Sequence, residues 1–438
     1  MVLPVASSAS VDVPQRISAL AELTDAGLQV PVLGGATVLH TNLDYAASAP
    51  ALASVVRLLD RTSPWYASVH RGAGFASQVS TELVDQARAV VAKHVGARTD
   101  DVVVFTRNTT DALNLLAHVV PGDVVALDIE HHANLLPWRS RRVVVGQPTI
   151  EATLAAVEAE LASKPAALVV ATGASNVTGE VLPIRAFADV AHRYGARIAV
   201  DAAQLLPHRI VELEASDVDY VACSAHKAYA PYGTGALIGR RDWLDEAPAY
   251  LAGGGAVHRV ELDQVSWNSA PERHEAGTPN VLGIVAFAAA LQELERIGIP
   301  AREAHESALR TRLADGVDQI DGVRRVLGFS DVSESVGIVT ITRDAGSVGL
   351  LASALSAEFG ISVRAGRFCA HPFFDRIAGR ANGLRASLGL GTTSDDVDRF
   401  LDGVARLVHD GPKAEYVNGP HGWHPVADDR VRPRLLEL

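Results

Sequence analysis

The sequence predicts an α/β fold with a mostly parallel sheet flanked by helices, followed by a smaller α+β domain. Between residues 54 and 277, short apolar runs of strand length alternate with longer amphipathic stretches. After residue 298 the pattern changes to charged helical segments and alternating strands. The 438 residues are 48% hydrophobic and 21% charged, which is typical of a globular protein and excludes a disordered or collagen-like chain.

In the first region each apolar run is bounded by polar or turn-forming residues. The runs predict strands over residues 101–105, 124–127, 166–171, 197–200 and 218–223. Helical spacing of apolar residues predicts helices over 110–120, 150–162 and 184–194. Strands that alternate with helices join through right-handed crossovers into a mostly parallel sheet. Ligands of such a sheet bind beyond the carboxyl ends of its strands.

The second region predicts a separate small domain. A helix over 283–298 and a charged helix over 301–316 precede alternating strands at 336–342 and 361–364. We therefore expect an N-terminal arm (1–40), a large domain (41–298, with 41–53 joining the small domain), a small domain (299–410) and a tail (411–438). The tail is expected to pack on the body through its aromatic residues.

Charge and composition exclude several function classes. The balance of 39 basic and 51 acidic residues gives a net charge of −12, which argues against binding nucleic acid or an anionic membrane. The longest apolar run, residues 281–291, is too short to span a bilayer, and no basic leader precedes an apolar run at the N-terminus. Two cysteines are too few for a disulfide framework. We therefore expect a cytoplasmic enzyme.

Lys227 stands in the most distinctive local segment, residues 219–235. An apolar strand runs into Ser224, His226 and Lys227, and a Pro/Gly turn follows. Only four of the 39 basic residues are lysine, so this lysine is a candidate for chemistry that arginine cannot perform. A desolvated lysine can form a Schiff base, although an ordinary surface lysine beside a loop would give the same pattern.

Three further polar groups follow expected strands. Asp201 closes an apolar strand, where it is either a helix N-cap or a carboxylate that holds a protonated pyridine nitrogen. The hydroxyl-rich segment 106–110 precedes a helix and suits a phosphate, although Thr and Asn are also common caps. His131 and His132 are adjacent on a loop without a third ligand, so we expect no metal site.

Taken together, these clusters make the chain resemble pyridoxal 5′-phosphate (PLP) enzymes of fold type I. Within them it is similar to the class V aminotransferase superfamily and its suf-type cysteine desulfurase/selenocysteine lyase group. The motifs that carry the resemblance cover roughly residues 40–408 and lie at 43–47, 70–73, 106–111, 130–134, 175–179, 200–204, 224–227, 275–280, 363–366, 369–370 and 385–388. The resemblance implies a seven-stranded type of sheet, bound PLP and a homodimer.

The resemblance also implies a role for each matched residue. Lys227 would hold the cofactor covalently and move the substrate's Cα proton, while His131 would stack on the ring. The remaining cofactor contacts would come from Thr109, Asn176, Asp201, Gln204, Ser224 and His226, and from Thr278 of a second subunit. Arg385 would take the substrate carboxylate through a two-point fork, with Asn176 and Arg364 beside it.

The role of Cys369 decides which reaction the resemblance implies. A lone cysteine is most often a small buried hydrophobe, which we expect for Cys223. Near Cys369, the basic residues Arg364, Arg367 and His371 would favour the reactive thiolate. The position matches the persulfide-forming cysteine of the desulfurase group, which implies conversion of L-cysteine to L-alanine and a sulfur-acceptor protein as a partner.

The chain departs from the family pattern where Arg367 and Phe368 replace two histidines. Two alternatives therefore stay open. One is an aminotransferase-like C–S lyase or epimerase of specialised metabolism in which Cys369 is not the nucleophile. The other is a scaffold that has lost catalysis, which the retention of Lys227, Asp201 and Arg385 argues against.

Overall fold

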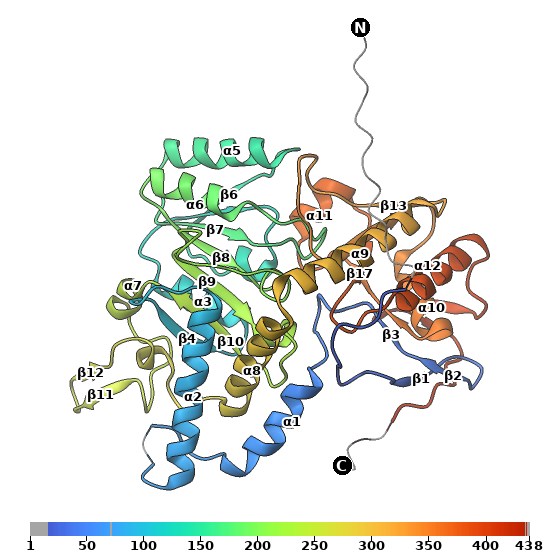
Figure 1. Ribbon diagram of the computed structural model, residues 1–438. Helices are drawn as coiled ribbons and strands as arrows, with labels where there is room; N and C mark the ends of the chain where they lie inside the picture. The colour runs from blue at the N-terminus through green and yellow to red at the C-terminus, as the bar shows by residue number, and fades with distance from the viewer. Residues whose placement is uncertain (1–15, 71, 434, 436–438) are drawn as a thin grey trace.

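A computed structural model of the chain describes residues 16–433, apart from residue 71, and residue 435. Residues 1–15 of the expected arm, and residues 434 and 436–438 of the expected tail, lie outside the described residues. Figure 1 shows two units side by side, one around a large sheet and one formed mainly by the C-terminal part of the chain. No described helix has the length and apolar character that crossing a bilayer requires.

The large unit is built on a seven-stranded mixed sheet. Its strands lie in the order β4 (Val102–Thr106), β10 (Gly235–Gly239), β9 (Tyr220–Ser224), β8 (Arg197–Asp201), β7 (Leu168–Thr172), β5 (Val124–Leu127) and β6 (Arg141–Val144). β10 runs antiparallel to both of its neighbours, and the pairs formed by β9, β8, β7, β5 and β6 are parallel. The chain steps outward from β5 to β6 and then returns to β7, so the crossover direction reverses between β5 and β7. Ligands bind at such a reversal.

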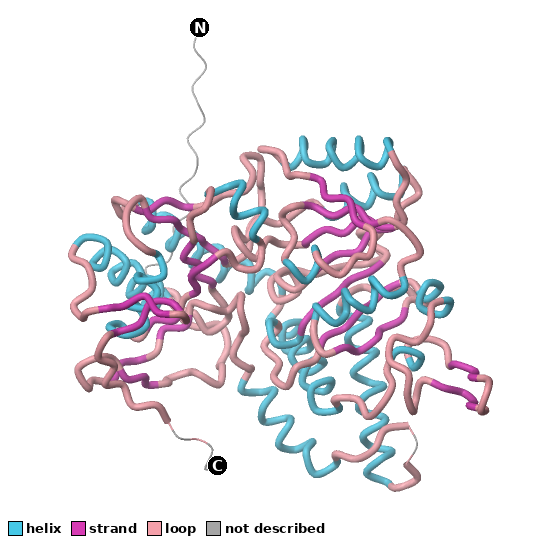
Figure 2. Tube along the Cα trace, turned by 180° about the vertical axis from the view of Figure 1, so that it is seen from behind, coloured by secondary structure: helices cyan, strands magenta, loops and turns pink. Residues whose placement is uncertain are grey.

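Successive residues of each strand point to opposite faces of the sheet and into two different cores. Val103 and Val125 face one core, whereas Val104 and Val124 face the other. The first core is covered by α1 (Ala53–Thr62), α2 (Phe75–His94), α5 (Ile150–Ser163), α6 (Ile184–Arg193) and α8 (Val281–Ile297). The second is covered by α3 (Thr109–Val119), α4 (His132–Leu135) and α7 (Arg241–Glu246). Seen from behind, the strands run between layers of helix (Figure 2).

The small unit has its own antiparallel sheet and core. The strand order is β13 (Val323–Arg325), β14 (Ile338–Arg343), β17 (Gly383–Ser387) and β16 (Arg364–Gly366). The helices in this part of the chain are α9 (Ile299–Asp318), α10 (Val348–Phe359), α11 (His371–Ala378) and α12 (Ser394–His409). The single strand expected over 361–364 is wrong, because the chain forms β15 (Ile361–Ser362) and β16, which join different sheets. β15 pairs with β3 (Thr41–Asn42), so the start of the matched region lies against the small unit.

The two units also contain short hairpins and 3₁₀ turns. Hairpins form from β1 (Gln29–Pro31) with β2 (Thr37–Leu39), β11 (Val257–Val260) with β12 (Val265–Trp267), and β18 (Tyr416–Gly419) with β19 (Gly422–Pro425). Single 3₁₀ turns are η1 (Ser63–Trp65), η2 (Ala225–Lys227) and η3 (Glu272–His274). The tail packs on α10, where the Tyr416 hydroxyl donates to Glu358 Oε1 at 3.1 Å and the Trp423 ring lies over Gly349.

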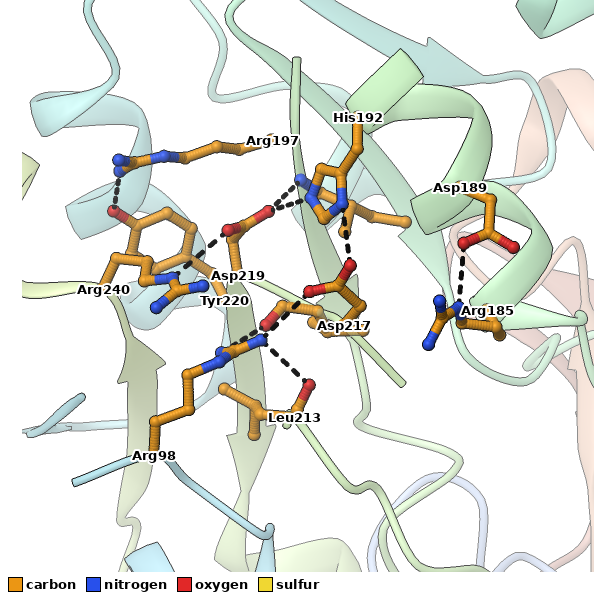
Figure 3. A network of polar contacts seen from close by, with 12 residues as sticks. Arg98, Arg185, Asp189, His192, Arg197, Leu213, Asp217, Asp219, Tyr220 and Arg240 are labelled. Atoms are coloured by element: carbon orange, nitrogen blue, oxygen red, sulfur yellow. Dashed lines mark hydrogen bonds and ion pairs between the residues drawn. The ribbon is translucent and has the colours of Figure 1, made fainter. Parts of the chain in front are cut away.

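The amino ends of the central strands are closed by ion pairs (Figure 3). Asp219, directly before β9, accepts from the backbone N–H of Ile198 at 3.0 Å and lies 2.8 Å from His192 Nε2. Asp217 links the other nitrogen of His192 to Arg98. The acidic side chains at this edge are therefore paired within the protein.

Candidate active site

A cavity of about 290 Å³ lies beyond the carboxyl ends of the parallel strands. Thr172, Asp201 and Ser224 are the last residues of β7, β8 and β9, and all three line it. Strands β16 and β17 of the small unit, and the loop that follows β16, supply its other wall. The cavity brings together Thr109, His131, Asn176, Asp201, Gln204, Ser224, His226, Lys227, Arg364, Cys369 and Arg385.

Lys227 ends the short turn η2 that follows β9, so its backbone is fixed by the central sheet. Burial lowers the pKa of its ammonium to about 8, and the charges of Arg385 and Arg364 act in the same direction. Asp201 partly opposes this shift. A neutral fraction at physiological pH enables the amine to act as a nucleophile and a base.

Asp201 is a buried carboxylate without a close cationic partner. Its Oδ1 accepts from the backbone N–H of Ala203 at 3.0 Å, and its side chain is only 5% exposed. Burial raises its pKa, while Lys227 acts to lower it. Such a carboxylate is costly unless a positive or N–H-bearing group approaches it, so the site suits a ligand that brings one.

A cluster of hydroxyl groups lies at the start of α3. The backbone N–H of Thr109 donates to Ser224 Oγ at 2.7 Å, and the two hydroxyl oxygens are 2.6 Å apart. Asn108 caps the helix by accepting from the N–H of Asp111. Burial lowers the pKa of His226 to about 4, so its imidazole is neutral at pH 7. Hydroxyls at a helix N-terminus favour an anion such as phosphate.

His131 lines the cavity and is held by a hydrogen bond to the backbone. Its Nδ1 accepts from the backbone N–H of Ala133 at 3.0 Å, which leaves the proton on Nε2. Burial lowers its pKa to about 4, and Lys227 adds to the shift. The ring is therefore neutral and suited to stacking. Gln204, which is buried nearby, donates from Nε2 to the carbonyl of Ala46 at 2.7 Å.

Two arginines line the small-unit side of the cavity. Arg385 is 2% exposed and donates from Nη1 to the carbonyl of Asn176 at 2.8 Å. Burial lowers its pKa to about 10. The ring of Phe368 lies 5.1 Å from the guanidinium carbon. Arg364 is largely exposed and shares the carboxylate of Asp44 with Arg385.

Cys369 is exposed at the cavity on a strained loop between β16 and α11. Phe368 and Cys369 have φ values of 52° and 55°, a region that residues other than glycine rarely adopt. The carbonyl of Phe368 accepts from Asn176 Nδ2 at 2.6 Å, and that of Cys369 from the N–H of His132 at 2.7 Å. These bonds hold the thiol at the same cavity as Lys227.

The two arginines expected to favour the thiolate are already paired with carboxylates. Arg364 pairs with Asp44 at 3.1 Å and Arg367 with Asp375 at 3.0 Å.

Cys223 is completely buried on β9, and burial raises its pKa to about 12, as expected for a small core residue.

Thr278 is exposed and does not line the cavity of its own chain. Among the described residues, no three His, Cys, Asp or Glu side chains cluster as a metal site would require.

Sequence reasoning assigned no role to Asp44 and treated Phe368 only as a departure from the family. Asp44 lies within a matched motif, but its arginine partners are more than 300 positions away, so only the folded chain reveals the contact.

Comparison with known proteins identifies the family. Residues 41–400 match the family Aminotransferase class-V. The chain belongs to this family. It is 34% identical over 382 residues to a cysteine desulfurase of Dickeya dadantii, covering 83% of this chain and 91% of that one. The family and the cysteine desulfurase group expected from the motifs are therefore confirmed.

Two further comparisons bear on fold and length. The chain superposes on an apo cysteine desulfurase from Thermococcus onnurineus with a TM-score of 0.79 and 29% identity, covering 90% of this chain and all of that one. The predicted α/β fold of this aminotransferase family is thus confirmed. A probable cysteine desulfurase of Mycolicibacterium paratuberculosis is 34% identical over 81% of this chain, but the chain spans only 54% of that longer protein.

Proposed function

We propose that this chain is a PLP-dependent cysteine desulfurase that converts L-cysteine to L-alanine and receives the sulfur on Cys369 as a persulfide. The observation that carries the proposal is that Lys227 and Cys369 line one cavity. That cavity also holds a buried carboxylate, Asp201, and a buried guanidinium, Arg385. A scaffold protein has no use for this combination.

The chemistry of the donor set fits PLP. Asp201 lacks a close cationic partner and would accept the N–H of a protonated pyridine ring. The neutral ring of His131 would stack on the cofactor, with Gln204 and Asn176 beside it. Thr109, Ser224 and the neutral imidazole of His226 would hold the phosphate. Lys227 would attach the cofactor, because its pKa of about 8 leaves part of the amine unprotonated.

Bound PLP supplies an electron sink for the carbanion that forms when the substrate loses its Cα proton. Arg385 would bind the substrate carboxylate, since burial excludes water from the ion pair. Lys227 Nζ would remove the Cα proton and would hold it for the later reprotonation. Asn176 would help to hold the substrate, and its side chain also fixes the loop that bears the nucleophile.

The sulfur step requires Cys369 as a thiolate. Its Sγ attacks the substrate sulfur, so an S–S bond forms and the substrate's C–S bond breaks. The electron pair of the broken bond stays with Cβ, which takes up a proton and becomes the methyl group of L-alanine. The overall exchange is balanced, because one thiol hydrogen moves to the methyl group and Cys369 retains S–SH.

The proposal extends to partners. A persulfide must pass its sulfur onward, so a sulfur-acceptor protein would dock over the loop that bears Cys369, and a cytoplasmic setting would suit this thiol chemistry. A homodimer in which Thr278 reaches a neighbouring cofactor phosphate is part of the same proposal.

The test measures L-alanine and sulfide released from L-cysteine in the presence of a thiol reductant. The native protein should release both products. Cys369→Ser should lose sulfide release by about 100-fold or more while keeping the absorbance band of the bound cofactor. Cys223→Ser is the matched control, since that thiol is buried and should not take part.

Two results would contradict the proposal. Release of pyruvate and ammonia in place of L-alanine would indicate C–S lyase chemistry. Full turnover of L-cysteine by Cys369→Ser would remove the nucleophile from the mechanism.

A further inference from the structure

Arg364 and Arg385 lie directly opposite each other on the adjacent antiparallel strands β16 and β17. Both guanidinium groups line the cavity. Like charges at directly opposed positions of a sheet repel, and Arg385 is almost completely buried. The pair therefore needs an anion on the protein to persist when no substrate is bound.

Asp44 provides this anion. Its Oδ2 accepts from Arg364 Nη2 at 3.1 Å and from Nε at 3.2 Å, and its Oδ1 lies 3.2 Å from Arg385 Nη2. The aspartate is fixed in place because its N–H donates to Asn42 Oδ1 at 3.1 Å and it forms a β-bridge with Ser387. One carboxylate thus bridges two arginines that arrive from different strands.

The charge of this cluster fits one further carboxylate. Two guanidinium groups and one carboxylate carry a net charge of +1. Arg385 Nε is buried and has no hydrogen-bond partner among the described residues, so the cluster retains an unused donor. A ligand with one carboxylate would neutralise the cluster. A second carboxylate would leave an uncompensated negative charge in the cluster and would be repelled by Asp44.

We infer that Asp44 is a specificity-determining residue that restricts this site to amino acids with one carboxylate and an uncharged side chain. It does so by occupying Arg364, which would otherwise pair with the second carboxylate of an acidic amino acid. The inference rests on the proposed function, because it takes Arg385 to be the site of the substrate carboxylate.

The test compares L-alanine with L-aspartate, which differ by the second carboxylate. Dissociation constants are measured for the PLP-loaded protein by titrating the cofactor absorbance, so the readout does not depend on turnover. The native protein should prefer L-alanine. Asp44→Asn keeps the shape of the side chain but removes its charge, and should shift the ratio of the two constants by roughly tenfold toward L-aspartate.

A second variant separates selectivity from folding. Arg364→Gln placed in the Asp44→Asn background should abolish the gain for L-aspartate, because the freed cation is missing. If Asp44→Asn does not fold, Arg364→Gln alone should weaken L-alanine binding, since the cluster would then carry no net charge.

Failure of the inference and failure of the proposed function give different results. If the native protein turns over L-cysteine but the ratio of constants is unchanged in a folded Asp44→Asn protein, the inference is wrong. If the native protein binds no amino acid at all, the proposed function is wrong.

Discussion

Lys227 shows how the fold sets the chemistry of a single residue. Its amine is buried beyond the end of β9 and is affected by the charges of two guanidinium groups, and both factors disfavour the charged form. Its pKa of about 8 is well below the ordinary lysine value of about 10.4. The charged form therefore dominates below about pH 8 and the neutral amine above it.

This pKa predicts the pH dependence of cofactor capture. The rate at which apo-protein binds added PLP covalently should rise with pH and level off above a midpoint near 8, because only the neutral amine attacks an aldehyde. Stopped-flow absorbance across pH 6 to 10 measures it. Asp201→Asn should move the midpoint to lower pH, since Asp201 stabilises the ammonium. A midpoint near 10 would show that burial does not perturb this lysine.

At the residue scale, the sequence predicts groups that end strands and does not predict contacts across the chain. Asp201 and Lys227 could be proposed because a polar residue that closes an apolar run must lie at a sheet edge. The packing of Phe368 on Arg385 joins segments that carry no shared local pattern. The resemblance implies only that an aromatic residue stands where the family pattern has histidine.

At the scale of elements, the strands that sequence reasoning missed differ in composition from those it predicted. β10 begins and ends in glycine and follows a Pro/Gly turn, so the segment resembled a loop. β6 starts with two arginines because it lies at the edge of the sheet, where charged side chains reach water. The predicted strands are continuous apolar runs because both of their faces are covered.

The opposite edge strand, β4, is closed by side chains. Glu275 accepts from the N–H of Phe105 at 2.6 Å, and Arg88 donates to the carbonyl of Val103 at 2.5 Å. Arg88 and Glu275 also form a two-point ion pair with both distances at 2.8 Å. Together they satisfy backbone groups that an edge strand otherwise leaves open.

Glu275→Ala should therefore destabilise the protein by about 3 kcal/mol, because it leaves a largely buried guanidinium and a backbone N–H without partners. Denaturant-induced unfolding measures the change. The matched control is Glu295→Ala, which breaks an exposed pair with Lys93 and should leave the midpoint almost unchanged. Equal effects of the two substitutions would show that β4 does not depend on this pair.

At the scale of the whole molecule, the proposed homodimer predicts that Thr278, which is exposed on its own chain, completes the cofactor site of a second copy. Mixing Lys227→Ala protein with Thr278→Ala protein under conditions of subunit exchange tests this. One site in each mixed dimer would combine an intact Lys227 with an intact Thr278 from its neighbour. PLP affinity and L-cysteine turnover should then exceed those of either variant alone.

The control is the double variant Lys227→Ala, Thr278→Ala mixed with native protein, in which no site is repaired. If Thr278 served its own chain, mixing the single variants would give no gain. A particle mass of one chain by light scattering, with full activity, would also exclude the dimer. The domain boundaries proposed from the sequence stay a prediction, which limited proteolysis can test.

Two hydrogen bonds connect the Cys369 loop to the large unit. The loop belongs to the small unit. Asn176 and His132, which donate hydrogen bonds to its carbonyls, follow strands of the large sheet. Lys227 and Asp201 are anchored on that sheet alone. A rotation that separated the two units would withdraw the thiol and leave Lys227 and Asp201 in place. Under the proposed function, cofactor attachment would then depend on the large unit alone, whereas sulfur transfer would also require the small unit to be in position.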